Sequence, residues 1–130
     1  MSEKKILIFE DEWGTIRGSF ELANLYAFNN ELKFHQVAKS QSVSFSHWND
    51  TFAAVFVDIA LAKKTEMDGF NIVKTIKEQQ LIDLKKVVVM TGNSKVKEKL
   101  KEMGFKDDEV RVLYKPVAFD EVARVLKEIL

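Results

Sequence analysis

Short apolar runs alternate with segments of helical periodicity, and this alternation limits what the chain can fold into. The runs lie at residues 6–9, 53–57, 87–90 and 110–114. Runs of this length are typical of strands that are buried on both faces of a parallel sheet. Parallel strands need long crossover connections, which are usually helices. The sequence therefore predicts an α/β fold with helices on both faces of a doubly wound sheet.

The intervening segments complete a pattern of five strands and five helices. Residues 32–38 are a weaker strand candidate, and 52–58 is the strongest. Helices are expected after the first strand up to about Asn29, within 40–51, over 69–80, over 94–103 with Gly104 as its cap, and over 119–130. In the first helix, Ile16, Phe20, Ala23 and Ala27 form an apolar stripe. We expect Leu22, Leu25 and Tyr26 to widen this stripe. The last helix should have an apolar stripe of its own, formed by Phe119, Val122, Ala123, Leu126, Ile129 and Leu130.

The composition bounds the class of protein. A chain of 130 residues fits one domain, residues 1–130, with one sizeable core. Twenty basic and twenty acidic residues cancel, so no global charge attracts nucleic acid or an anionic membrane. Cysteine is absent, and no uncharged stretch approaches the length of a membrane span. We therefore expect a soluble, cytoplasmic protein that binds neither nucleic acid nor membrane.

Polar residues follow the apolar runs. Glu10 and Asp11 follow the first run, Asp58 ends the strongest strand, and Thr91 and Lys115 follow the last two runs. Open parallel sheets bind ligands at the carboxyl ends of their strands. We therefore expect three carboxylates, a hydroxyl and an ammonium to converge at one edge of the sheet.

These side chains suit a phosphoryl group held beside Mg²⁺. Hard oxygen ligands without His or Cys favour Mg²⁺, and crowded carboxylates raise one another's pKa unless a cation lies between them. A carboxylate nucleophile beside Mg²⁺ and a lysine is sufficient to form an acyl phosphate. Asp58, alone at the end of its strand, is the candidate nucleophile, whereas Glu10 and Asp11 are the pair better placed to share a metal.

Each residue also has a plainer structural interpretation. Residues 10–12 could be an acidic cluster that favours the start of a helix. Asp58 could be a turn residue, Thr91 a loop hydroxyl and Lys115 a solvated cation. It is their combined placement at strand ends that favours a site.

Five motifs in order resemble the receiver domain of two-component response regulators, the CheY-like family. They lie at residues 6–12, 55–58, 67–70, 89–91 and 115–116, so the resemblance covers nearly the whole chain. It implies a flavodoxin-like, doubly wound parallel sheet of five strands in the order 2-1-3-4-5, with five helices.

The resemblance also implies a role for each site residue. Asp58 would accept the phosphoryl group, Asp11 and Asp58 would bind Mg²⁺ directly, and Glu10 would help through a water molecule. The backbone carbonyl of Ala60 would supply another metal ligand. Thr91 and Lys115 would contact the phosphoryl oxygens, and a cis-prone bond before Pro116 would aim Lys115 inward.

The sequence departs from the family pattern in three places. Ala62 replaces the usual proline and Gly69 comes three residues late, so residues 63–66 form an apparent insertion, which we expect to be tolerated surface length. Val112 stands where the family carries a Tyr or Phe, and Tyr114 should point to the opposite sheet face from Leu113. Glu10 and Gly92 replace the commoner Asp and Ala.

The leading functional hypothesis is a single-domain response regulator that catalyses only its own phosphorylation and dephosphorylation. A sensor histidine kinase or phosphotransfer protein would be its donor, and a downstream protein would bind the region 94–130. The alternative is a pseudo-receiver that binds partners constitutively. A third hypothesis, a phosphohydrolase of the haloacid dehalogenase type, needs a second Asp two residues after the first, where this chain has Ala60.

Overall fold

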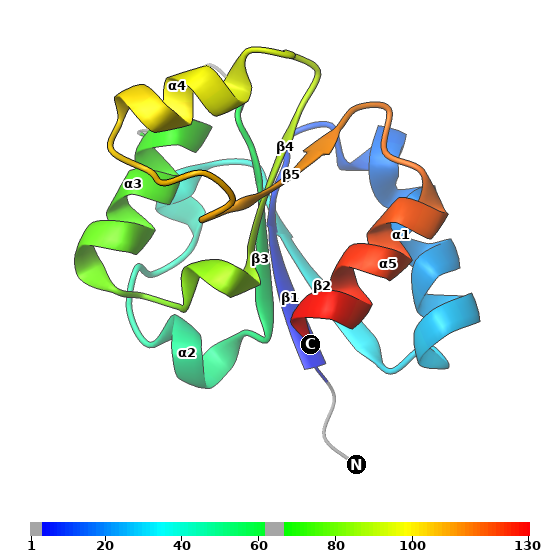
Figure 1. Ribbon diagram of the computed structural model, residues 1–130. Helices are drawn as coiled ribbons and strands as arrows, with labels where there is room; N and C mark the ends of the chain where they lie inside the picture. The colour runs from blue at the N-terminus through cyan, green and yellow to red at the C-terminus, as the bar shows by residue number, and fades with distance from the viewer. Residues whose placement is uncertain (1–3, 62–66) are drawn as a thin grey trace.

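Five parallel strands form the centre of the computed structural model, which describes residues 4–61 and 67–130 (Figure 1). The sheet order is β2-β1-β3-β4-β5, as the resemblance implied. The strands are β1 (Lys4–Phe9), β2 (Leu32–Val37), β3 (Ala54–Asp58), β4 (Val87–Thr91) and β5 (Arg111–Tyr114). The order reverses between β1 and β3, which are direct neighbours. Ligands bind in open α/β sheets at such a reversal, beyond the carboxyl ends of the strands.

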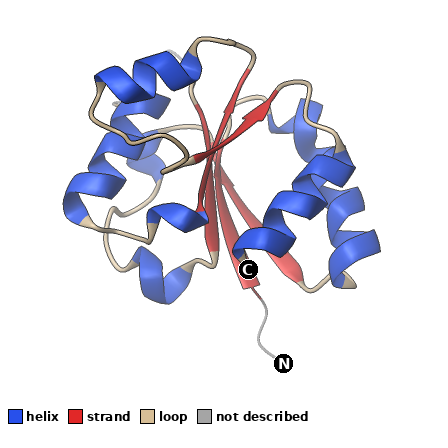
Figure 2. Cartoon of the chain, in the orientation of Figure 1, coloured by secondary structure: helices blue, strands red, loops and turns tan. Residues whose placement is uncertain are grey.

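Helices cover both faces of the sheet, as Figure 2 shows. The helices are α1 (Trp13–Phe28), α2 (Trp48–Thr51), α3 (Gly69–Gln79), α4 (Val96–Glu102) and α5 (Phe119–Ile129). Short 3₁₀ turns lie at Ser40–Ser42 and Leu84–Lys86. Helices α1 and α5 lie together on one side, and α2, α3 and α4 lie on the other (Figure 1).

Two apolar clusters, one on each sheet face, hold the layers together. Successive strand residues point to opposite faces, so Ile6 and Ile8 pack toward α1 and α5, whereas Leu7 and Phe9 pack toward the other helices. All four side chains are fully buried. Burial on both faces explains why β1, β3 and β4 are continuous apolar runs rather than alternating ones.

A buried polar bridge fixes α1 to β2. The Asn24 side-chain amide donates to the Leu32 carbonyl oxygen at 3.0 Å, and the Leu32 backbone N–H donates to Asn24 Oδ1 at 3.0 Å. Helix α1 ends at Phe28, close to the predicted end, and Asn29 caps it in the left-handed conformation. The sequence pattern did not predict this bridge, because Asn24 is a polar residue next to an otherwise apolar stripe and its partner lies on another element.

Several element boundaries and packing predictions need correction. Strands β3 and β5 begin later than predicted, at Ala54 and Arg111, and α4 is shorter at both ends. The helix expected within 40–51 exists, but α2 has only four residues. Two packing predictions were wrong, namely the widening of the first stripe and the place of Phe119 in the last one. The side chains concerned are substantially exposed: Leu22, Leu25, Tyr26 and Phe119. The rings of Tyr26 in α1 and Phe119 in α5 contact each other on the outer surface, with 6.0 Å between their centroids.

The predicted insertion at 63–66 and its neighbour Ala62 lie outside the described residues. Within the described part of the chain, no helix is both long and apolar enough to cross a bilayer.

Candidate functional site

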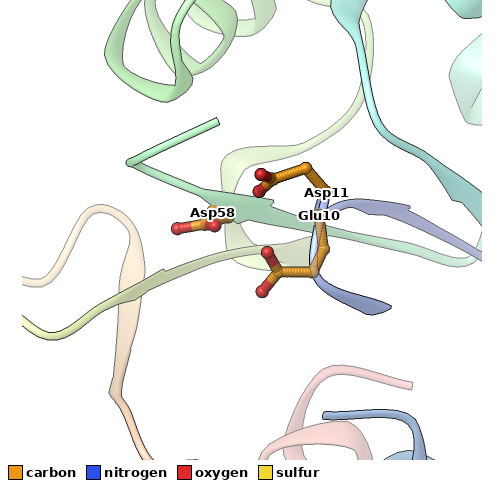
Figure 3. Close-up of side chains that lie close together, drawn as sticks. All are labelled: Glu10, Asp11 and Asp58. Atoms are coloured by element: carbon orange, nitrogen blue, oxygen red, sulfur yellow. The ribbon is translucent and has the colours of Figure 1, made fainter. Parts of the chain in front are cut away.

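The carboxyl ends of β1 and β3 bring the predicted acidic residues together. Carboxylate oxygens of Glu10, Asp11 and Asp58 all lie within 4.8 Å of one another. Figure 3 shows the three side chains extending from these two strand ends into one space. Glu10 is fully buried and Asp58 is 3% exposed, whereas Asp11 faces solvent. The cluster therefore combines two buried carboxylates with one that is open to water.

Lys115 closes the site from the end of β5. Its Nζ lies 2.6 Å from Glu10 Oε1 and 3.2 Å from Asp58 Oδ2. The Lys115 backbone N–H donates to the Thr91 carbonyl oxygen at 2.8 Å, and the bond to Pro116 is cis. A lysine that is far away in the sequence is thus paired with both buried carboxylates.

Burial is the main reason that the pKa of Glu10 is raised, and the net value, with all neighbouring groups included, is about 7. Contact with the Asp58 carboxylate raises this pKa further, whereas Lys115 and the Glu12 N–H oppose the rise. Burial alone would lower the pKa of Lys115, but its contacts with Glu10 and Asp58 outweigh burial, and the pKa is raised. One ammonium therefore does not fully compensate two buried carboxylates.

This donor set fits Mg²⁺. It consists of carboxylate oxygens alone, without the nitrogen or sulfur ligands that transition metals prefer. The raised pKa of Glu10 is the result expected of crowded carboxylates that lack sufficient positive charge. Asp11, which is exposed, leaves room for the water molecules that Mg²⁺ commonly keeps.

The structure also places Ala60 and Thr91 beside the cluster. The Ala60 backbone N–H donates to Asp58 Oδ1 at 3.0 Å, which fixes the carboxylate against its own turn. Thr91 is buried at the end of β4, next to β3, and its hydroxyl accepts the Asn93 N–H at 3.0 Å. The metal-ligand role of the Ala60 carbonyl and the phosphoryl contacts of Thr91 and Lys115 stay predictions.

Gly69 also belongs to the site, although it comes three residues later in the sequence than the family pattern predicts. Its backbone N–H donates to the Ile59 carbonyl oxygen at 3.3 Å, and a Cβ at this position would overlap the backbone of Asp58 and Ile59. The chain thus keeps a glycine against the backbone of the candidate nucleophile even though the spacing differs from the family pattern.

Val112 packs with the cluster on the α2, α3 and α4 side of the sheet. Leu113 belongs to the opposite cluster, and Tyr114 is 41% exposed. As predicted, therefore, Tyr114 and Leu113 lie on different faces. Leu113 is the one buried residue of β5 and Val112 is half-buried, so neither of these positions carries an aromatic side chain.

Solved structures with this architecture cover almost the whole chain. A receiver domain of a Pseudomonas aeruginosa sensor histidine kinase, which has a magnesium ion coordinated in its active site cleft, is 19% identical with a TM-score of 0.71, covering 98% of each chain. The Vibrio cholerae chemotaxis protein CheY4 is 17% identical with a TM-score of 0.68, covering 99% of this chain and 100% of the other. This chain has the receiver-domain fold.

A third receiver domain, from a Francisella response regulator, is 15% identical with a TM-score of 0.65, covering 97% of this chain and 96% of the other. No protein-family model and no curated protein matches the sequence. The receiver likeness is therefore one of fold, and the function has to be argued from the side chains.

Proposed function

We propose that this chain is a response regulator receiver in which Asp58 accepts a phosphoryl group in a reaction that requires Mg²⁺. The observation that carries the proposal is the convergence of Glu10, Asp11, Asp58 and Lys115 at the carboxyl edge of a receiver-type sheet. Asp11 and Asp58 would hold the metal directly, and Glu10 would do so through water. The metal would neutralise charge on the transferred group.

In the transfer step, an Asp58 carboxylate oxygen forms a bond to phosphorus. The bond between phosphorus and the donor atom breaks, and its electron pair leaves with the donor, which is a histidine nitrogen in a kinase or phosphotransfer protein. Lys115 is close enough to Asp58, at 3.2 Å, to stabilise the added negative charge. Thr91, at the adjacent strand end, would donate its hydroxyl to a phosphoryl oxygen. The chain would thus catalyse only its own phosphorylation and dephosphorylation.

The partners that this function implies are proteins. A sensor histidine kinase or phosphotransfer protein would supply the phosphoryl group, and a downstream protein would bind residues 94–130, which include α4, β5 and α5. Such exchange would take place in the cytoplasm without nucleic acid or membrane binding. Phosphorylation acts in such modules by biasing a conformational equilibrium.

The test uses acetyl phosphate as the phosphoryl donor. We expect incubation with Mg²⁺ to add one phosphoryl group to the intact protein, as measured by mass spectrometry. Omission of Mg²⁺ and the substitution Asp58→Asn should each abolish the adduct. The control variant is Asp68→Asn, which changes an exposed carboxylate at the start of α3 and should still form the adduct.

The pseudo-receiver alternative predicts a different result. A protein that binds its partners constitutively would form no adduct and would not bind beryllofluoride, a mimic of the phosphoryl group. An adduct that persists in Asp58→Asn would also contradict the proposal, because another residue would then be the acceptor.

A further inference from the structure

We propose that Glu10 is a positioning residue that holds the Lys115 ammonium beside Asp58, and that this role requires the length of a glutamate. The Glu10 to Lys115 distance of 2.6 Å is shorter than the 3.2 Å between Lys115 and Asp58, so Glu10 is the closer partner. The effect of this positioning on phosphoryl transfer rests on the function proposed above. The Glu10–Lys115 contact itself does not depend on that function.

The Glu10 main chain is fixed on the neighbouring strand. Its backbone N–H donates to the Val37 carbonyl oxygen at 3.0 Å, and its own carbonyl oxygen accepts the Gln36 side-chain amide at 2.6 Å. With both backbone groups held by β2, the reach of the carboxylate depends on the length of the side chain. The backbone has little freedom to move a shorter side chain closer to Lys115.

The two carboxylate oxygens of Glu10 have separate partners. Oε1 pairs with Lys115 Nζ, and Oε2 accepts the Glu12 backbone N–H at 3.2 Å. This second bond turns the carboxylate so that the first oxygen faces Lys115. Because Glu10 is fully buried and Lys115 is 24% exposed in its side chain, the pair is shielded from much of the surrounding water.

The carboxylate of an aspartate at position 10 would not reach the Lys115 ammonium. It is shorter by one carbon–carbon bond, about 1.5 Å, which takes the contact beyond the hydrogen-bond limit of about 3.2 Å. The charge would remain in the site, still able to bind Mg²⁺ through water. The substitution Glu10→Asp therefore separates the reach of the side chain from its charge.

The first measurement follows the reactivity of Lys115 in protein without metal. An amine-specific reagent is applied in EDTA, and peptide mass spectrometry compares Lys115 with exposed Lys74 in the same sample. We expect Lys115 to react severalfold faster in Glu10→Asp than in the native chain, because the ammonium loses its closest partner. Asp68→Asn, which removes an exposed carboxylate outside the cluster, should leave Lys115 reactivity unchanged.

The second measurement is the rate of adduct formation from acetyl phosphate at saturating Mg²⁺. We expect Glu10→Asp to slow it about tenfold, the loss that corresponds to one charge-assisted hydrogen bond. In a Lys115→Met background the same substitution should have little further effect. Binding of Mg²⁺, measured by calorimetry, should change much less than the rate.

Each outcome decides one part of the inference. Unchanged Lys115 reactivity in Glu10→Asp overturns the positioning role, whether or not the protein accepts a phosphoryl group. A rate loss that is equal in both backgrounds, or that is matched by an equal loss of Mg²⁺ affinity, shows that Glu10 acts through the metal alone. Native protein that forms no adduct contradicts the proposed function, while the reactivity result still tests the Glu10–Lys115 contact.

Discussion

At the scale of single residues, the site holds charge in places where the chain otherwise buries apolar side chains. Glu10 directly follows β1 and Asp58 ends β3, and residues 6–9 and 54–57 of these strands are all apolar and buried. Burying a carboxylate is unfavourable unless it is paired and hydrogen-bonded. Here Lys115 and two backbone N–H groups, those of Glu12 and Ala60, provide partners. That a charge cluster persists in the core is best explained by chemistry at this edge.

Gly69 should tolerate no side chain. In Gly69→Ala the new methyl group would overlap the backbone of Asp58 and Ile59, so we expect a loss of about 1–3 kcal/mol in the free energy of unfolding. Adduct formation should also slow, because the backbone beside Asp58 has to shift. Urea unfolding measures the first effect.

The matched control is Gly18→Ala in α1. An added Cβ there meets no atom within 4 Å, so relief of glycine's backbone entropy should stabilise the chain by about 0.5–1 kcal/mol. If both variants lost stability equally, the close approach of Gly69 would not be the cause.

Glu109 supplies a pH-dependent contribution that is remote from the carboxylate cluster. The Lys106 backbone N–H is the main reason that its pKa is lowered, and Lys77, 3.1 Å away, lowers it further. A carboxyl group with a lowered folded pKa stabilises the protein above its unfolded pKa, and this stability is lost as pH falls through the folded value.

We therefore expect Glu109→Gln to destabilise the protein at pH 7, by about 0.2–1 kcal/mol because the ion pair is partly exposed. The difference from the native chain should shrink as the pH falls below the ordinary carboxyl pKa. Urea unfolding over a pH series, with exposed Glu78→Gln as control, checks this. A difference that stays constant across the series would contradict it.

At the scale of elements, the edge strand β5 borders open cavities, whereas the side chains of the central strands β3 and β4 are buried. Two open cavities, of about 500 Å³ and about 210 Å³, both have Val112 in their lining. Val89, its direct neighbour in β4, is fully buried. Val112, at the position of the family's usual aromatic residue, thus borders open space as well as the apolar cluster.

An aromatic residue should therefore be tolerated at position 112. We expect Val112→Phe to change the free energy of unfolding by less than about 1 kcal/mol, whereas Val89→Phe should lose about 1–3 kcal/mol through overpacking. Thermal or urea unfolding of the two variants gives the comparison. Equal losses would mean that the cavities beside Val112 cannot accept a larger side chain.

At the scale of the whole molecule, short-range signals predicted the parallel sheet and the convergence of Glu10, Asp11, Asp58 and Lys115, whereas the strand order came from the resemblance to receiver domains. Buried parallel strands are continuous apolar runs, and the polar residues directly after them have to lie at the ligand-binding edge. The positions of Glu10, Asp11, Asp58 and Lys115 follow from that rule alone.

Other features depend on contacts that no local pattern encodes. The exposure of Leu22, Leu25 and Tyr26 is set by where α5 lies against α1, and the role of Gly69 is set by its approach to the Asp58 backbone. The Glu10–Lys115 ion pair joins residues from opposite ends of the chain. Such contacts depend on the tertiary arrangement of the chain, so local sequence patterns do not predict them.

The most direct test of the central claim is to locate the phosphoryl group itself. Protein treated with acetyl phosphate and Mg²⁺ is reduced with borohydride, which converts a phosphorylated aspartate into homoserine, and the peptides are sequenced by mass spectrometry. The account predicts homoserine at position 58 and nowhere else, and none when Mg²⁺ is withheld. Homoserine at Asp11 or at another carboxylate, or its absence from position 58 in protein that carries the adduct, would contradict it.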